Sequence, residues 1–223
     1  MSQQKADWII DSKTPRFDAD FRKQLCELLV WRRDVRRFRL ESLPEETLDR
    51  LIKLASLSPS VGLSQPVRFV LVEDPARRRA VLQNFEECNA DALSALSSDR
   101  ANHYARLKLS GLREAPCQLG VFADRSTRQG YGLGRRTMPE TIEYSAVIAV
   151  HTLWLAARVE EIGLGWVSIL DPKEISVVLD VPENWSFVAY LCLGYPQKVD
   201  DVPELAREGW EQRRQAESLL VRR

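Results

Sequence analysis

The sequence predicts one α+β domain spanning residues 1–223, because three of its properties agree. The length of 223 residues suits a single domain. The composition, 44% hydrophobic and 29% charged, provides enough apolar side chains for a full core and differs from that of a disordered chain. Segments with helical and strand patterns follow one another irregularly, without a repeat or a low-complexity linker.

The first third of the chain predicts two helices and a strand. The first helix is expected where apolar residues share one helical face, at Phe21, Leu25, Leu28 and Leu29. A capping box of Ser42 and Glu45, with Pro44 in the first turn, predicts the start of the second helix. That helix is expected to stop at Ser58-Pro59, because proline disfavours the helical conformation in the residue before it. The β-prone run 67–72 predicts a buried strand.

The remaining elements are expected to be helices 75–96, 141–159 and 172–179, strands 118–123, 166–170 and 187–193, and a glycine- and arginine-rich loop at 125–136. Helix 141–159 is apolar on nearly every side, which predicts burial at the centre or at a subunit interface. Gly163 and Gly165 are expected to end it. Two polar stretches complete the domain, a mobile lid at about 97–110 and a C-terminal arm at about 203–223 that covers a neighbour.

Charge and composition exclude several classes of function. Thirty-two basic residues balance thirty-two acidic ones, so no general field attracts nucleic acid or anionic membrane. No apolar run is long enough to span a membrane. The isolated His103 and His151 make a metal site improbable. Free thiols in a cytoplasmic protein are expected, since residues 1–11 lack a signal-peptide pattern and no CxxC pair exists among the cysteines, Cys26, Cys88, Cys117 and Cys192.

The segment RRDVRRF, residues 32–38, places four arginines around one carboxylate, Asp34. Arginine supplies both the charge and the directional N–H groups that a phosphate monoester requires. In a helix or turn, Arg32 and Arg36 share one face, and Arg33 and Arg37 share another. An equally good interpretation of the cluster alone is a solvated basic patch that ends a helix.

A second segment, SPSVGLSQPVRFVLV at residues 58–72, follows about two dozen residues later. Ser60, Val61 and Gly62 form a small-residue turn whose backbone N–H groups can bind an anion or the polar edge of a flat ring. Ser64 then leads towards the strand. Alone, this segment is an ordinary turn. Together, the two segments indicate a site for a phosphorylated ring compound.

These segments, the apolar helix, GLGWVSIL (163–170) and LCLGYP (191–196) occur in the order found in the nitroreductase superfamily, which the chain resembles over residues 25–196. The resemblance implies a central mixed or antiparallel sheet flanked by helices, an intertwined homodimer, and FMN bound at the subunit interface. It implies that Arg32, Arg33 and Arg36 hold the FMN phosphate, that residues 60–62 lie near the ring or the ribityl chain, and that residues 165–168 face the isoalloxazine ring. The FMN contacts that it implies are Arg32, Arg33, Asp34, Val35, Arg36, Ser60, Val61, Gly62, Ser64, Gly165, Trp166, Ser168 and Arg207.

Three positions depart from the superfamily pattern, which has serine at Asp34, asparagine at Leu63 and an aromatic residue at Val67. A carboxylate beside a phosphate weakens anion binding unless the arginines compensate it. Asp34 either forms a salt bridge with Arg37 or Arg33, or takes part in proton chemistry.

RRDVR, Ser168 and the segment YGLGRRTMPETIEYSAV (131–147) resemble a narrower group, the flavin destructases that make 5,6-dimethylbenzimidazole for the lower ligand of vitamin B12. This resemblance implies that Asp34 and Ser168 are catalytic, with Asp34 removing a proton from the ribityl C1′ and Ser168 donating to the ring. Reduced FMN is then the substrate, supplied by a separate flavin reductase and consumed with O2, and D-erythrose 4-phosphate is the second product.

Two alternatives stay open. An NAD(P)H-dependent nitroreductase or flavin reductase would retain FMN, purify as a yellow protein and oxidise NAD(P)H directly. A flavin-binding protein without turnover would leave Asp34 without a use.

Overall fold

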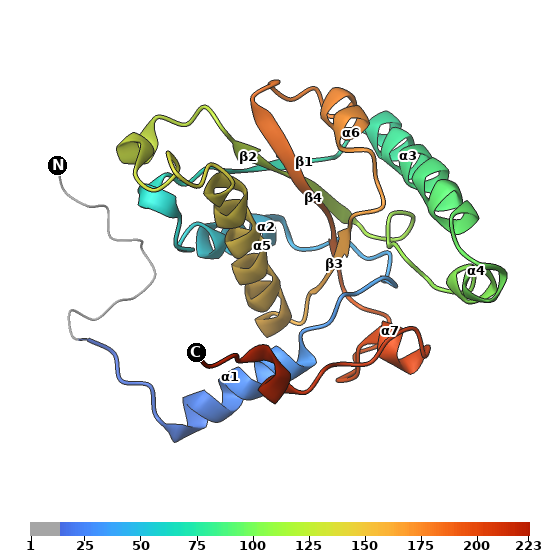
Figure 1. Cartoon of the computed structure of the whole chain (residues 1–223), viewed down its shortest axis with the longest axis horizontal. Coiled ribbons are helices and arrows are strands. Elements are labelled where there is room, and N and C mark those ends of the chain that lie inside the picture. The colour runs from blue at the N-terminus through green and yellow to red at the C-terminus, as the bar shows by residue number, and fades with distance from the viewer. Residues whose placement is uncertain (1–13) are drawn as a thin grey trace.

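The computed structural model describes residues 14–223 as a four-stranded antiparallel sheet with helices on both faces (Figure 1). The strands lie in the order β1-β2-β4-β3, with the bounds β1 Val67–Leu71, β2 Cys117–Asp124, β3 Gly163–Val167 and β4 Trp185–Gly194. The helices are α1 Ala19–Trp31, α2 Glu45–Ala55, α3 Pro75–Ser94, α4 Ser98–Tyr104, α5 Thr141–Val159, α6 Pro172–Val178 and α7 Glu204–Arg207. The predicted α+β fold is therefore confirmed.

Alternation along β4 divides the core into two layers, because successive side chains of a strand point to opposite faces. Ala189 and Leu191 join the layer beneath α2 and α5, which those helices complete through residues such as Leu51 and Leu153. Tyr190 and Cys192 join the opposite layer, beneath α3 and α6, with Val81, Phe85 and Ile175. Both layers of helices are visible on either side of the sheet (Figure 1).

Helix α5 is buried only on the side that faces the sheet. Seven of its residues are buried, but Tyr144, Val147 and Ile148 remain 53%, 40% and 41% exposed in the single chain. Helix α1 packs near α5 and contains no buried residue, and its apolar side chains Phe21 and Leu25 are 44% and 41% exposed. The expected burial of 141–159 on all sides is thus not met within one chain, which leaves an apolar surface across α1 and α5.

Strand β3 starts at Gly163, three residues before the expected start at 166, and α5 has already ended at Val159. The prediction that Gly163 and Gly165 end the helix is therefore wrong. The glycines are needed for close packing, because a Cβ on Gly165 would lie 2.1 Å from the carbonyl oxygen of Val35. This closeness lets residues 34–38 lie along the edge of the sheet, where Asp34 bridges Leu164 in parallel.

The expected capping box at the start of α2 is also wrong. The N-cap residue is Pro44, and no side chain caps the helix. The amide of Thr47 instead donates to the Pro44 carbonyl at 3.0 Å, so the first turn closes through the backbone. Helix α2 then ends at Ala55, shortly before the expected stop at Ser58-Pro59.

The two polar stretches lie against each other within the chain. The 97–110 segment contains α4, and the C-terminal segment follows α7 with a 3₁₀ turn at Ala216–Leu219. The Trp210 ring meets His103 and Tyr104 of α4 edge-on, at centroid distances of 5.6 and 6.1 Å. In the part of the chain that is described, none of the helices has the length and apolar character needed to cross a membrane.

Candidate functional site

The segment 32–37 runs in an extended conformation beside β3. Helix α1 ends at Trp31, and the Val35 amide donates to the Leu164 carbonyl at 3.0 Å. In an extended chain, side chains two residues apart share a side. Asp34 and Arg36 are therefore neighbours, a pairing that a helical arrangement of this segment would not produce.

Asp34 has a hydrogen-bond partner at each carboxylate oxygen. Its Oδ1 accepts from the Trp166 amide at 2.9 Å, and its Oδ2 accepts from Arg36 Nε at 2.9 Å and lies 2.8 Å from Arg36 Nη2 in the same ion pair. Burial raises the pKa of Asp34, while Arg36 and the Trp166 amide oppose that shift. The side chain keeps 31% of its surface exposed. The salt-bridge hypothesis is right in kind, but the partner is Arg36 rather than Arg37 or Arg33.

Two of the four arginines are neutralised by carboxylates. Arg36 pairs with Asp34 and also donates from Nη1 to the carbonyl of Lys108 at 2.9 Å. Arg37 pairs with Glu204 of α7, which ties the C-terminal segment to the cluster.

Arg32 and Arg33 form no salt bridge among the described residues, although Asp34 acts on Arg32 and Asp200 and Asp201 act on Arg33 from further away. Their Nε atoms are buried without hydrogen-bond partners, and the Arg32 guanidinium lies 4.9 Å from the centre of the Trp154 ring. Burial lowers the pKa of both arginines, and the nearby charge of Arg213 lowers it further. Unpaired, mutually repelling cations of this kind favour the binding of an anion.

These residues surround a cavity of about 340 Å³. Its walls come from residues 31–37, from the C-terminal part of α5, from the start of β3 and from the 196–208 segment. Arg207 lines it and pairs with Asp200. One cavity thus brings together six of the predicted contacts, Arg32, Arg33, Asp34, Val35, Arg36 and Arg207.

The second motif lies elsewhere in the chain. Ser60 lines a separate cavity of about 250 Å³ between α2 and α5, and the Val61 amide donates to Ser145 Oγ at 3.0 Å. Gly62 adopts φ +56° and packs against the 3₁₀ turn Gln129–Gly132. A Cβ on Gly62 would lie 2.9 Å from the Leu133 carbonyl oxygen. The Ser64 hydroxyl is buried without a partner among the described residues.

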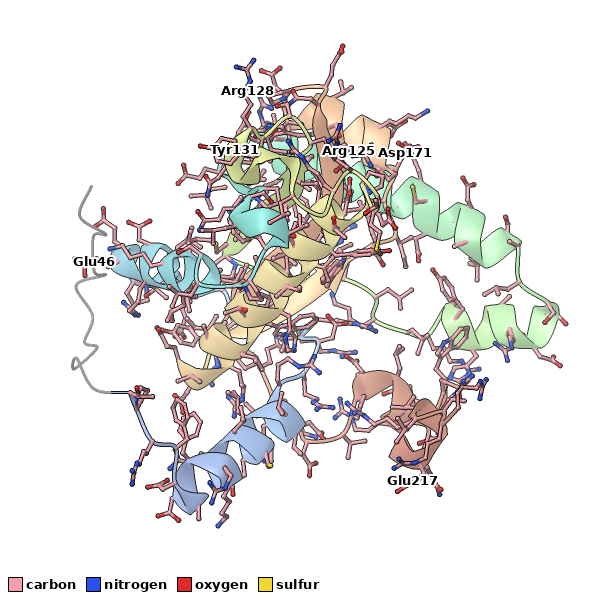
Figure 2. The ribbon with its side chains drawn as sticks, turned by 60° about the vertical axis from the view of Figure 1, so that its left-hand side comes forward. Glu46, Arg125, Arg128, Tyr131, Asp171 and Glu217 are labelled. Atoms are coloured by element: carbon pink, nitrogen blue, oxygen red, sulfur yellow. The ribbon has the colours of Figure 1, made fainter. Side chains whose placement is uncertain are left out.

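Figure 2 shows how far the loop that covers this turn lies from the end of the chain. Arg125, Arg128 and Tyr131 gather at one end of the molecule, and Glu217 of the C-terminal segment lies at the other. Within one chain, the second motif and the arginine cavity therefore do not form a single site.

Strand β3 contains Gly165 and Trp166, and Ser168 follows directly after the strand. The buried Gly165 faces the Val35 backbone, and Trp166 supplies the amide that binds Asp34. Ser168 is exposed just beyond the end of the strand. Because an extended chain rises about 3.3 Å per residue, Ser168 lies roughly 7 Å along the chain from the Trp166 amide.

Trp154 and Lys108 belong to the site but were not anticipated from the sequence. Trp154 underlies Arg32 and donates its indole N–H to the Arg33 carbonyl at 3.1 Å. The sequence gives no signal for it, because it is one apolar residue in an apolar helix. The close packing of residues 34–38 on β3 could have been predicted. Gly163 and Gly165 stand at alternate positions of a β-prone run, and glycine within a strand indicates close backbone approach.

The chain belongs to the nitroreductase family, whose sequence model matches residues 29–195. Its relatives include a 5,6-dimethylbenzimidazole synthase of Rhodospirillum rubrum, 56% identical over 90% of this chain and 95% of the relative. A second synthase, of Rhodobacter capsulatus, is 48% identical over 88% of this chain and 95% of the relative. Within the family, the chain is a member of this 5,6-dimethylbenzimidazole synthase group.

Solved structures agree with this fold. An iodotyrosine deiodinase bound to FMN and 3-iodo-L-tyrosine superposes with a TM-score of 0.67 at 26% identity, covering 79% of this chain and 91% of that one. A protein of Desulfovibrio desulfuricans, described as a nitroreductase and solved with FMN, has a TM-score of 0.62 at 21% identity and covers 89% of this chain and 96% of its own. At that identity the second likeness supports the fold alone.

Proposed function

We propose that this protein is a 5,6-dimethylbenzimidazole synthase that consumes FMNH2 as its substrate. In this reaction O2 and FMNH2 give 5,6-dimethylbenzimidazole, the lower ligand of cobalamin, and D-erythrose 4-phosphate, and the remaining pyrimidine part of the flavin ring leaves as a third product. The observation that carries the proposal is Asp34, a largely buried carboxylate that shares a cavity with two unpaired arginines. The identity of 56% to a synthase supports the same conclusion.

The charge of the cavity fits the phosphate of FMN. Asp34 offsets Arg36 and Glu204 offsets Arg37, so Arg32 and Arg33 retain their full charges. A phosphate monoester carries a charge of about −1.5 to −2 at pH 7, which these two cations balance. Arg32 and Arg33 therefore hold the phosphate, and bound FMNH2 supplies the electrons for O2 and the carbon skeleton of the product.

Asp34 acts as the general base. The ribityl C1′–H is a poor acid, and its removal requires a base held at hydrogen-bonding distance in a site with little water. The raised pKa of Asp34 makes its carboxylate a stronger base than a solvent-exposed aspartate. Arg36 and the Trp166 amide fix its orientation, and the exposed hydroxyl of Ser168 donates to the polar edge of the ring.

A second copy of the chain completes the site. The exposed apolar residues of α1 and α5 offer a surface for an intertwined homodimer, and the two motifs occupy separate cavities in one chain. In the dimer, Ser60, Val61, Gly62 and Ser64 of one copy approach the arginine cavity of the other. Light scattering should give about twice the chain mass of 25.6 kDa. A monomer that is fully active would contradict this arrangement.

The 97–110 segment serves as the lid and the 203–223 segment as the arm that holds it. Their contact through Trp210 holds the two segments together, and as a lid they limit access of water to the substrate. A separate flavin reductase supplies FMNH2, because FMN is consumed in its reduced form and must be replaced after each turnover. The four free cysteines support a cytoplasmic location.

The test is to incubate the protein in air with FMN, NADH and an unrelated flavin reductase, and to follow the products by chromatography. We expect 5,6-dimethylbenzimidazole in proportion to the FMN consumed, none without O2, and none with Asp34→Asn. The surface variant Asp49→Asn is the matched control and should behave as wild type. A yellow protein that oxidises NADH without the reductase, retains its FMN and forms no product would instead establish the nitroreductase alternative.

A further inference from the structure

We propose that Arg36 is a positioning residue that fixes the Asp34 carboxylate and ties it to the lid segment 97–110 through the Lys108 carbonyl. The position of the Asp34 carboxylate then depends on the position of segment 97–110, and the position of this segment depends in turn on its link to Asp34. This inference rests on the proposed function, in which Asp34 removes a proton from the substrate.

Arg36 connects two parts of the chain through two hydrogen bonds and an ion pair. Nε donates to Asp34 Oδ2 at 2.9 Å, Nη2 lies 2.8 Å from the same oxygen, and Nη1 donates to the Lys108 carbonyl at 2.9 Å. The guanidinium is planar, so its donors keep fixed angles to one another. Its side chain is only 12% exposed, which leaves little room to reorient. A shift of the Lys108 carbonyl must therefore turn the guanidinium or break its bonds to Asp34.

The lid joins the body of the protein beside this connection. Lys108 Nζ pairs with Glu114 Oε1 at 2.6 Å, which closes the loop after the lid. Gly111 lies flat against Phe38, since a Cβ there would come within 2.3 Å of the ring. The base of the lid is thus fixed next to Arg36, while α4 at its far end is held by Trp210. Arg36 is the link between this base and the carboxylate.

The contacts of Arg36 differ from those of Arg32 and Arg33. Its charge is offset by Asp34, and two of its five N–H groups already donate hydrogen bonds within the protein. In Arg32 and Arg33, by contrast, the Nε atoms have no hydrogen-bond partner among the described residues, so these arginines can bind an anion. Loss of Arg36 should therefore act on the base, and so on kcat, more than on the affinity for the phosphate.

The charges around Asp34 give the direction of the expected titration. Arg36 and Arg32 favour the ionised carboxylate, and so does the Trp166 amide of β3. Glu204 of α7 opposes ionisation, as does burial. Burial already outweighs the groups that favour ionisation, and loss of the opposite charge of Arg36 raises the pKa of Asp34 further. A base with a higher pKa is protonated over more of the pH range, so the acidic limb of the rate profile moves to higher pH.

The experiment compares Arg36→Gln, Arg36→Lys and Arg113→Gln with the wild type. Arg113 is the control, because it follows the lid, is 63% exposed and pairs with Glu86 outside the cavity. Asp34 titration is followed by carboxyl ¹³C NMR, and backbone motion of 97–110 by hydrogen exchange, both in the ligand-free protein. Steady-state kinetics with FMNH2 and the pH profile of product formation complete the comparison.

Arg36→Gln should raise the Asp34 titration midpoint, speed exchange across 97–110, and lower kcat at least tenfold with a change in KM under about threefold. Arg36→Lys should largely restore the titration, because the charge remains. It should leave exchange fast, because one ammonium cannot make the same fork of bonds. Arg113→Gln should match the wild type in all measurements.

A rise in KM with unchanged kcat, titration and exchange would overturn the inference and make Arg36 a ligand of the phosphate. If Arg36→Gln does not fold, slow exchange in Arg36→Lys has the same consequence. Failure of the proposed function is a separate result, in which the wild type forms no product. The titration and exchange of the ligand-free protein decide the link between Arg36 and the lid even then.

Discussion

Replacing Gly165 with alanine tests whether residues 34–38 must lie directly on β3. A Cβ at this position would be 2.1 Å from the Val35 carbonyl oxygen, whereas Cβ contacts below 3.0 Å essentially do not occur. The obstructing atom belongs to the backbone, so it cannot turn away as the end of a side chain would. Residues 34 and 35 must therefore move outward by about 0.9 Å or more, the difference between these two distances.

That displacement affects both stability and chemistry. Overpacking of this kind costs about 1–3 kcal/mol, and loss of the Val35 amide bond to Leu164 adds about 1 kcal/mol. The expected loss of unfolding free energy is therefore about 2–4 kcal/mol, which lowers Tm by roughly 5–15 °C in a chain of this size. Because Asp34 precedes Val35, it moves as well, and a misplacement of about 1 Å reduces kcat about 100-fold.

Gly120→Ala provides the control, since this glycine lies in β2 and its added Cβ would meet Leu179 Cδ1 at 2.5 Å. The end of a leucine side chain can move, so we expect a loss below about 1.5 kcal/mol and a wild-type kcat. Denaturant unfolding and product formation measured on both variants separate the two effects. A Gly165→Ala protein as stable and active as Gly120→Ala would refute the close packing of the arginine segment on β3.

Three further substitutions should have separable effects. Asp34→Asn should lower the rate of product formation by at least about 100-fold, and the wild-type rate should rise with pH as Asp34 ionises, above the ordinary aspartate range because burial raises its pKa. A pH–rate profile checks both statements, and an active variant would contradict the assignment of the base. Trp154→Phe removes the indole bond to the Arg33 carbonyl and should cost about 1 kcal/mol of unfolding free energy, with a severalfold rise in KM; unchanged values would exclude a role for this ring beneath Arg32. Trp210→Ala should speed tryptic cleavage of α4 and increase the H2O2 released per FMNH2 oxidised, and unchanged partitioning would argue against the lid.

The long elements could be predicted from local patterns. Helix α5 has the bounds expected from its apolar run, and α3 begins at Pro75 as expected and ends at Ser94, two residues before the predicted end. Proline at a first helical turn and a sustained apolar pattern are local signals, and tertiary contacts did not override them here. The sequence also allowed Arg32, Asp34 and Arg36 to be grouped at one site, because they are close neighbours in the chain.

The partners of those residues could not be predicted, because they come from distant parts of the chain. Arg36 reaches Lys108 across 72 residues, and Arg37 reaches Glu204 across 167. Sequence periodicity also cannot distinguish a helical from an extended arginine segment when only six residues are considered. Nor does the order of two motifs tell whether they meet within one chain or between two copies. The folded chain adds that the two motifs lie in separate cavities and that α1 and α5 expose apolar side chains.

The position of Asp34 also has a consequence for how tightly the phosphate is held. A resident cofactor gains from every cation that contacts its phosphate, so an acid that offsets one of four arginines would be a disadvantage. A consumed substrate differs, because its phosphate leaves on the four-carbon fragment after each turnover. Contacts equally strong before and after the reaction do not raise kcat and can slow that release. Under the proposed function, pairing with Asp34 removes Arg36 from the phosphate contacts, which favours product release. The same aspartate, at a position where the superfamily pattern has serine, places a base beside the substrate. One residue therefore serves both product release and catalysis.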